Sequence, residues 1–206
     1  MGQTANNSWN YPASSDLVKD GATAIQTLAD DIDTTLGVYG APGLVKINTT
    51  TFSAVSSQSL NSVFTSTYKD YKIVLSDLIG STTTQDLSMR LRKSGTDNTS
   101  NIYHRDWIRG AGVTLTGARE QNTSYIIGGV ISTGTNMSVW NIFSPQIATS
   151  RTNLIGMASF QATNDMVVIS NVFSHDLTSS ADFDGFTIYP ASGTFSGTVQ
   201  VFGYKA

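Results

Sequence analysis

The chain of 206 residues has no cysteine and only one glutamate, Glu120, among its 15 acidic residues. The lack of cysteine excludes a disulfide scaffold, a thiolate metal site and a cysteine nucleophile. Glutamate favours helix interiors, whereas aspartate favours caps and turns. The composition therefore argues against a mainly helical protein and favours an all-β one.

Charge is also scarce, since Asp, Glu, Lys and Arg make up 13% of the residues, against about 25% in an ordinary soluble domain. The net charge of −3 is unlike that of nucleic-acid-binding proteins, which are usually basic. No run approaches the roughly 18 apolar residues of a membrane helix, and the first residues lack the features of a signal peptide. Hydroxyl groups replace the charge, with 27 Thr and 26 Ser. We expect no nucleic-acid partner, no membrane insertion and no cofactor.

One segment, residues 14–36, has helical periodicity. Ser14 or Ser15 can cap its first turn, and Gly37 stands where a helix commonly ends. Apolar residues near heptad spacing form a narrow strip: Val18, Ile25, Leu28 and Ile32. An isolated helix this short is marginal in water, so the strip predicts association with copies of the same helix. Packing of the helix on its own β domain is the alternative.

Residues 1–13 form a polar arm that carries Trp9, Tyr11 and Pro12. Two aromatic rings and a proline suit an extended anchor that orders in a groove of another protein. A hydrophobic staple on the chain's own helix is an equally supported interpretation. We therefore assign residues 1–43 to an anchoring arm, a helix and a linker.

Residues 44–206 show alternation with a period of two. In one such run, Leu87, Met89 and Leu91 alternate with Ser88, Arg90 and Arg92. About ten short runs of this kind, separated by clusters of Gly, Asn, Asp and Ser, predict an antiparallel β-sandwich. The prediction is an all-β fold with jelly-roll-like connectivity, preceded by the arm and the short oligomerising helix.

No constellation of side chains predicts catalysis or a metal site. His104 and His175 are far apart in the sequence and have no metal-ligand spacing. Asp182 and Asp184 would face one side of a strand, which permits a glycosidase-type pair or a Ca²⁺ site, but they fit turn positions better. The sequence has no nucleophile elbow, P-loop or dinucleotide fingerprint. We therefore expect a protein that is not an enzyme.

Four arginines are candidates for a ligand-facing surface: Arg90, Arg92, Arg105 and Arg109. A locally basic sheet face of this kind could meet an acidic glycan, a phosphate or an acidic neighbouring subunit. The alternative is a solvated strand face that nearby carboxylates balance, because isolated surface charges contribute little free energy.

Two stretches resemble virion proteins of tailed bacteriophages. The segment from Trp9 to Asp33 is similar to the N-terminal arm and helix of tail-fibre and minor tail proteins. Residues 47–56, 71–75, 87–92, 183–194 and 197–204 are similar to the C-terminal β-sandwich of fibre-like virion proteins. Together they cover most of the chain.

The resemblance implies a homotrimeric, non-enzymatic component on the tail or capsid surface of a virion. Its arm would attach to other virion proteins, and its sandwich would bind glycans of the host surface. A fibre normally has a long shaft, whereas only a short helix precedes this β domain. A decoration or head-fibre protein that coats or reinforces the capsid is therefore an alternative. A carbohydrate-active enzyme or lectin-like module is a second alternative.

Overall fold

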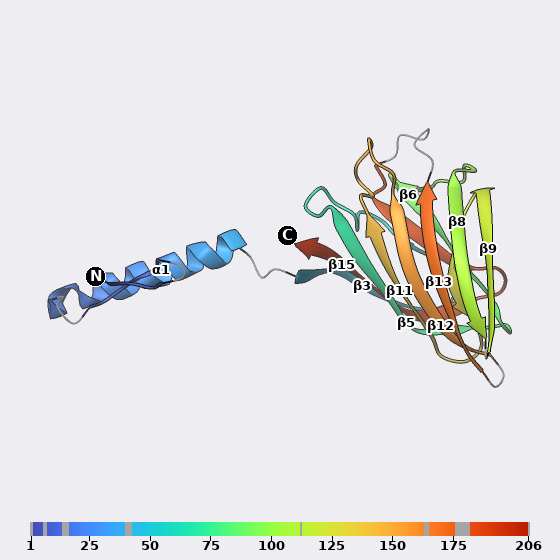
Figure 1. The fold of residues 1–206 in the computed structure, drawn as a ribbon, viewed down its shortest axis with the longest axis horizontal. Coiled ribbons are helices and arrows are strands. Elements are labelled where there is room, and N and C mark those ends of the chain that lie inside the picture. The colour runs from blue at the N-terminus through green and yellow to red at the C-terminus, as the bar shows by residue number, and fades with distance from the viewer. Residues whose placement is uncertain are drawn as a thin grey trace. The chain divides into compact units, whose positions relative to one another are not determined.

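The computed structural model describes residues 2–5, 8–13, 17–39, 43–111, 113–162, 165–175 and 182–205. The chain divides into two compact units (Figure 1). The first comprises Met1–Gly43 with the last two residues, and the second comprises Leu44–Tyr204. No helix in the described ranges is long and apolar enough to span a membrane.

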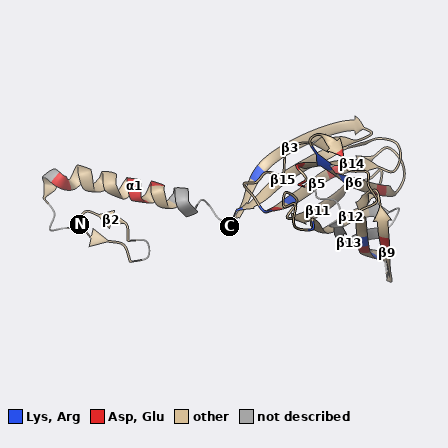
Figure 2. Ribbon diagram, turned by 90° about the horizontal axis from the view of Figure 1, so that it is seen from above, with Lys and Arg blue, Asp and Glu red and all other residues tan. Residues whose placement is uncertain are grey.

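The first unit contains a two-stranded ribbon and one helix. Strand β1 (Gly2–Gln3) pairs antiparallel with β2 (Asn10–Tyr11). A 3₁₀ turn over Val18–Asp20 leads into helix α1 (Gly21–Tyr39). The charged residues of the helix are mainly acidic, as its red segments in Figure 2 show.

The helix ends later than the sequence predicts. Leu17 has φ −70° and ψ 140°, which is extended backbone, so Val18 is the first helical residue of the described segment that starts at Leu17. The predicted caps, Ser14 and Ser15, lie outside the described residues. Gly37 was predicted to end the helix, but α1 continues through it to Tyr39. A single glycine inside a helix costs only about 1 kcal/mol, so it does not stop a helix that the next residues continue.

The second unit is a sandwich of two antiparallel sheets, which confirms the predicted fold class. The larger sheet has the strand order β3-β15-β5-β11-β12-β13-β8-β9. The smaller sheet has the order β10-β6-β14-β4, with β7 paired to β6. The strand bounds are β3 Gly43–Val55, β4 Gln58–Leu60, β5 Asp70–Gly80, β6 Gln85–Lys93, β7 Thr96–Asp97, β8 Tyr103–Ala111, β9 Thr114–Thr123, β10 Ile126–Ile131, β11 Asn136–Phe143, β12 Asn153–Ala162, β13 Asp165–His175, β14 Gly185–Pro190 and β15 Phe195–Lys205.

The chain crosses repeatedly from one sheet to the other. Strand β4 lies in the smaller sheet, β5 in the larger and β6 in the smaller again. The hairpin β8–β9 and the meander β11–β12–β13 belong to the larger sheet, and β10 between them belongs to the smaller one. This alternation wraps the chain around one core, as in a jelly roll.

The core between the sheets consists of alternate residues from both. On β6, Leu87, Met89 and Leu91 are fully buried, as the alternation predicts. Trp140 of β11 is also fully buried, and its indole nitrogen donates a hydrogen bond to the carbonyl of Gly128 on β10 (2.9 Å). This bond joins a strand of the larger sheet to the edge strand of the smaller one.

Candidate functional site

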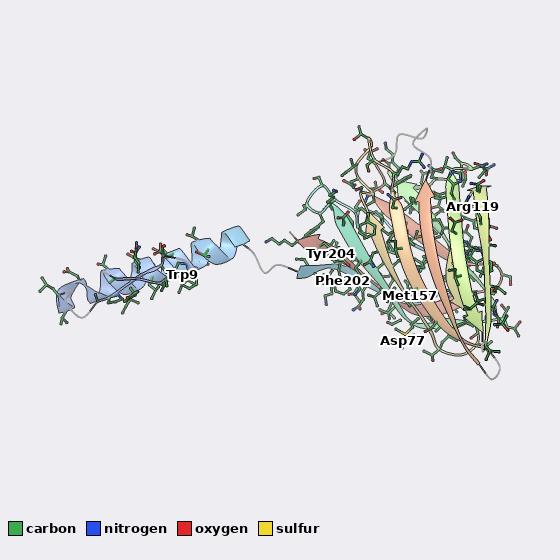
Figure 3. All side chains as sticks on the ribbon, viewed as in Figure 1. Trp9, Asp77, Arg119, Met157, Phe202 and Tyr204 are labelled. Carbon is green, nitrogen blue, oxygen red and sulfur yellow. The ribbon has the colours of Figure 1, made fainter. Side chains whose placement is uncertain are left out.

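The arm lies on the chain's own helix. The indole nitrogen of Trp9 donates to the hydroxyl of Thr35 on α1 (2.8 Å). The backbone and side-chain nitrogens of Asn10 both donate to the same carboxylate oxygen of Asp31 (3.0 Å each). Figure 3 shows Trp9 beside the helix. Trp9 therefore contacts the chain's own helix, but through a hydrogen bond in the last part of α1 and not as a staple at its first turn, while Tyr11 and Pro12 are exposed. Anchoring by Tyr11 and Pro12 stays a prediction.

The predicted helix strip is only partly covered. Val18 is 97% exposed and Ile25 is 63% exposed, whereas Leu28 and Ile32 are half-buried. Val18 belongs to the 3₁₀ turn and Ile25 to α1, and their separation of seven residues corresponds to about two helical turns, which places them on a similar side. The arm contacts the adjacent side of the helix, where Asn10 donates a hydrogen bond to Asp31. The first unit therefore exposes the apolar side chains of Val18 and Ile25 beside the side of the helix that its own arm contacts.

The structure separates the four candidate arginines into two places. Arg90 and Arg92 lie on the outer face of the smaller sheet, opposite the buried residues of β6. Arg105 and Arg109 lie on the face of β8 that is turned toward the smaller sheet, where both line one cavity. They therefore do not form a single basic surface.

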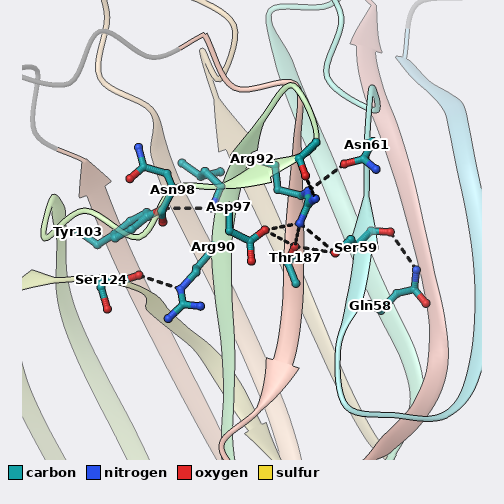
Figure 4. A network of polar contacts seen from close by, with 12 residues as sticks. Gln58, Ser59, Asn61, Arg90, Arg92, Asp97, Asn98, Tyr103, Ser124 and Thr187 are labelled. Atoms are coloured by element: carbon teal, nitrogen blue, oxygen red, sulfur yellow. Dashed lines mark hydrogen bonds and ion pairs between the residues drawn. The ribbon is translucent and has the colours of Figure 1, made fainter.

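Arg92 is engaged within the sandwich (Figure 4). Its guanidinium donates to the side chains of Asn61 (2.8 Å), Ser59 (3.0 Å) and Thr187 (2.6 Å). It also donates to the carbonyl of Gly95 and forms an ion pair with Asp97. These contacts connect β4, β6, β7 and β14. Arg92 therefore stabilises the sheet, and its donors already have partners within the chain.

Arg90 has two contacts on the same face. Its guanidinium carbon lies 5.0 Å from the ring centroid of Tyr189, and its Nε donates to the carbonyl of Ser124 (3.1 Å). A guanidinium stacked on an aromatic ring keeps its charge but loses freedom to reorient. Arg90 thus also contributes to the structure of this face.

A cavity of about 180 Å³ lies between β8 and β9 of the larger sheet and β6 and β10 of the smaller sheet. We call it the flank cavity. Two aliphatic residues of β10 form part of its wall. Its polar and aromatic lining consists of Asp86, Arg105, Trp107, Arg109 and Glu120.

Arg105 is the most buried charged group of this lining, with 7% of its surface exposed. It forms an ion pair with Glu120 (2.6 Å) and donates to the carbonyl of Ile127 (2.9 Å). Its guanidinium carbon lies 5.5 Å from the ring centroid of Trp107. In the described part of the chain, Nε of Arg105 and Nε1 of Trp107 are buried donors without a hydrogen-bond partner.

The carboxyl of Asp86 stands at the rim of the flank cavity. Desolvation raises its pKa above the usual value, and the positive charges of Arg105 and Arg109 act in the opposite direction. The charge of Glu120 raises the pKa further. The flank cavity therefore combines two arginines, two carboxyl groups and an indole in a partly dehydrated space.

The sequence alone did not single out Asp86, Trp107 and Glu120 as lining residues of one site. A signal for two of them was present, because alternation along β8 places Trp107 on the same face as Arg105. Glu120 is opposite Arg105 in the β8–β9 hairpin, and the two residues are equally far from its turn. Asp86 comes from a different sheet, so only the packing of the sheets brings it to the cavity.

The carboxylates Asp182 and Asp184 have separate structural partners. Asp182 pairs with Lys93, and this hydrogen bond lowers the pKa of Asp182. Asp184 accepts a hydrogen bond from the backbone nitrogen of Ser94 (2.8 Å). Both carboxylates therefore contact the turn that follows β6. Asp182 and Asp184 themselves lie in irregular structure before β14, and not in the turn that the sequence predicts there.

The register of β8 and β13 places His104 opposite Ser174 and His175 opposite Tyr103, so the two histidines lie on adjacent strands although they are far apart in the sequence. Nδ1 of His104 accepts a weak hydrogen bond from the backbone nitrogen of Asn122 (3.4 Å). The imidazole of His175 lies outside the described side chains. Among the described residues, no group of three or more His, Asp or Glu side chains could hold a metal ion.

The outer face of the larger sheet carries exposed apolar side chains. Met137 on β11, Ile155 and Met157 on β12 and Ile108 on β8 are each about half exposed or more. Figure 3 labels Met157 on this face. Exposed apolar side chains gathered on one face are typical of interaction surfaces.

Comparisons with known proteins give no family. No protein-family model matches the chain, and no curated protein matches it. Among solved structures, the chain is similar to the Ruminococcus gnavus IT-sialidase CBM40 bound to alpha2,3 sialyllactose. The identity is 11%, the match covers 76% of this chain and 92% of that chain, and the TM-score is 0.33.

Two further solved structures are still less similar. A second structure of the Ruminococcus gnavus IT-sialidase CBM40 has 11% identity, coverage of 76% and 91%, and a TM-score of 0.31. The E230A-fructofuranosidase from Schwanniomyces occidentalis, complexed with fructosylnystose, has 7% identity, coverage of 78% and 34%, and a TM-score of 0.22. Likenesses this weak carry no argument about function, and the phage resemblance stays a prediction from the sequence.

Proposed function

We propose that the chain is a homotrimeric, non-catalytic appendage protein on the surface of a tailed-phage virion. Its arm and helix attach it to the particle and to its own copies, and its β-sandwich faces glycans of the host surface. The observation that supports self-association best is the exposed strip at Val18 and Ile25. The phage location and the number three derive from the sequence resemblance.

The strip supports association because of its chemistry and its place in the chain. Apolar surface in water is unfavourable by about 25 cal/mol for each Å². The strip belongs to a unit with few strands and one helix, and it flanks a helix face that the arm already covers. β-Branched residues at seven-residue spacing are typical of helix bundles. Copies of the same helix are the partner that this spacing fits.

The exposed apolar face of the larger sheet fits the same assembly. The helix ends at Tyr39 and the first strand of the sandwich begins at Gly43, so the connection is short. In a trimer, such short connections hold the three sandwiches at a high effective concentration, at which weak contacts become occupied. Neighbouring copies are therefore the proposed partners of the face around Ile155 and Met157.

Deletion of residues 2–13 is expected to abolish incorporation into particles while the sandwich stays folded. The deletion removes Tyr11 and Pro12, the exposed candidates for contact with the particle, and it leaves the sandwich sequence intact. Incorporation is measured by labelled antibodies on intact particles, and folding by circular dichroism.

The double variant Tyr11→Ala/Pro12→Ala keeps Trp9 on the helix and is expected to lose incorporation as well. The exposed arm residue Gln3 provides the matched control, and Gln3→Ala should incorporate normally. Normal incorporation of the deletion variant would exclude the arm as the anchor. Label on the capsid shell, with none on the tail, would favour the decoration protein over the tail appendage.

A further inference from the structure

We propose that the flank cavity binds one uncharged sugar ring, held by the free donors of Arg105 and Trp107 and by the carboxyl of Asp86. This inference rests on the proposed glycan-binding role, and it names the site and the class of ligand. None of the arginines on the outer face of the smaller sheet takes part.

The first argument comes from hydrogen bonding. Native proteins contain few buried donors without a partner, because such donors lose their bonds to water. Two of them, Nε of Arg105 and Nε1 of Trp107, belong to neighbouring residues of the same strand face, and both residues line the flank cavity. An acceptor oxygen of a ligand that reached these two donors would supply the hydrogen bonds that they lack.

The second argument comes from charge. The lining contains Arg105 and Arg109 together with Glu120 and Asp86, so that two positive groups are balanced by two carboxyl groups, and Arg105 is already paired with Glu120. An added anion would approach two carboxyl groups, and an added cation would approach two guanidinium groups. Each would lose its hydration without a net opposite charge to replace it. A neutral ligand fits this lining better than an ion.

The third argument comes from the kind of polar group that is needed. The lining offers N–H donors on Arg105 and Trp107 and carboxylate acceptors on Asp86. A hydroxyl group both donates and accepts, so adjacent hydroxyls of one ring can bond a guanidinium and a carboxylate at the same time. Trp107 and the two aliphatic residues of β10 provide apolar surface for the C–H groups of the ring.

The size of the cavity limits the ligand to a single ring. Its volume of about 180 Å³ is smaller than the roughly 300–1,000 Å³ of sites for drug-sized ligands. Each water molecule occupies about 30 Å³, so several water molecules fill the cavity when no ligand is bound. A sugar ring that binds there displaces them. A longer glycan would place one residue in the cavity and the others outside.

The test measures binding of methyl glycosides to the 206-residue protein. The probes are the methyl glycosides of glucose, galactose and mannose, with N-acetylneuraminic acid and glucosamine as the charged comparisons. Saturation-transfer NMR detects binding, and titration gives Kd. We expect at least one neutral glycoside to bind with a Kd in the millimolar range, as is usual for a few hydrogen bonds at one site, and both charged sugars to bind at least tenfold more weakly.

Two variants assign the binding to the flank cavity. Trp107→Phe keeps an aromatic ring but removes the N–H, and Asp86→Asn removes the carboxylate charge at nearly constant size. Each is expected to weaken binding of the neutral glycoside at least tenfold. The matched control is Asp106→Asn, because Asp106 lies on the exposed outer face of the same strand as Trp107. It should leave Kd unchanged.

Thermal unfolding keeps the result interpretable. Trp107→Phe removes a buried donor without a partner, so its Tm should equal or exceed that of the parent protein. Three results would overturn the inference. The first is that no neutral glycoside binds at a concentration tenfold above the expected Kd. The second is that Trp107→Phe and Asp86→Asn both bind the glycoside as tightly as the parent protein does, and the third is that N-acetylneuraminic acid binds more tightly than any neutral glycoside. The oligomer mass is measured on the same samples, so a trimer without sugar binding rejects only this inference, and a sugar-binding monomer rejects the trimer instead.

Discussion

The Ile25→Asp variant is expected to sediment as a monomer under conditions in which the parent protein is a trimer. Ile25 is 63% exposed in the single chain, so its side chain is available to a partner helix. Burial of one isoleucine side chain contributes about 1.5–3 kcal/mol, and a trimer contains three copies. Aspartate would instead place three like charges in one seam. We therefore expect the apparent dissociation constant to rise at least a thousandfold.

Thr23→Asp is the matched control for this prediction. Thr23 is exposed and lies two residues from Ile25, which is about 200° around the helix. The same charge is added there, but on the opposite side of α1. Sedimentation velocity should show Thr23→Asp as a trimer and Ile25→Asp as a monomer. Equal behaviour of the two variants would show that the strip does not form the interface.

The Trp140→Ala variant is expected to lose about 3–5 kcal/mol of unfolding free energy, the usual range for a fully buried tryptophan. Trp140 is completely buried, and its indole nitrogen bonds to Gly128 across the two sheets. Methyl groups built at Gly128 and Gly156 would overlap its ring, so the two glycines enclose it tightly. Urea denaturation followed by circular dichroism gives the change.

The glycines allow a second, independent measurement. Gly156→Ala adds a methyl group against Trp140 and should cost about 1–3 kcal/mol, as overpacking does. In the double variant Trp140→Phe/Gly156→Ala the smaller ring makes room, so the two changes should cost less together than separately. Strict additivity would show that the glycine does not enclose the ring. Trp9→Ala, in the other unit, should leave the unfolding of the sandwich unchanged.

The core could be predicted from the sequence because it depends on a local pattern. Alternation along β6 requires only that one face be buried, and Leu87, Met89 and Leu91 are buried as expected. The bounds of the helix could not be predicted with the same accuracy. A glycine at position 37 weakens a helix without ending it, and the extended backbone of Leu17 has no clear signal in the sequence.

The roles of the arginines depend on strands that are distant in sequence. Arg92 and Arg105 both stand at alternating positions of a strand, so the sequence does not distinguish them. The partners of Arg92, Ser59 and Thr187, come from β4 and β14. Only the order of the strands in the smaller sheet brings these hydroxyl groups to it. Arg105 has its ion-pair partner in the next strand, so its pairing with Glu120 follows from a hairpin, whereas its place in the flank cavity follows from how the two sheets pack.

The mass of the 206-residue protein in solution tests the central claim most directly. Light scattering coupled to size-exclusion chromatography at micromolar concentration should give three times the chain mass of 22.0 kDa. The same mass should persist at raised salt, because the proposed seam is apolar. A mass of one chain across the whole concentration range would contradict self-association through the helix and, with it, the proposed appendage.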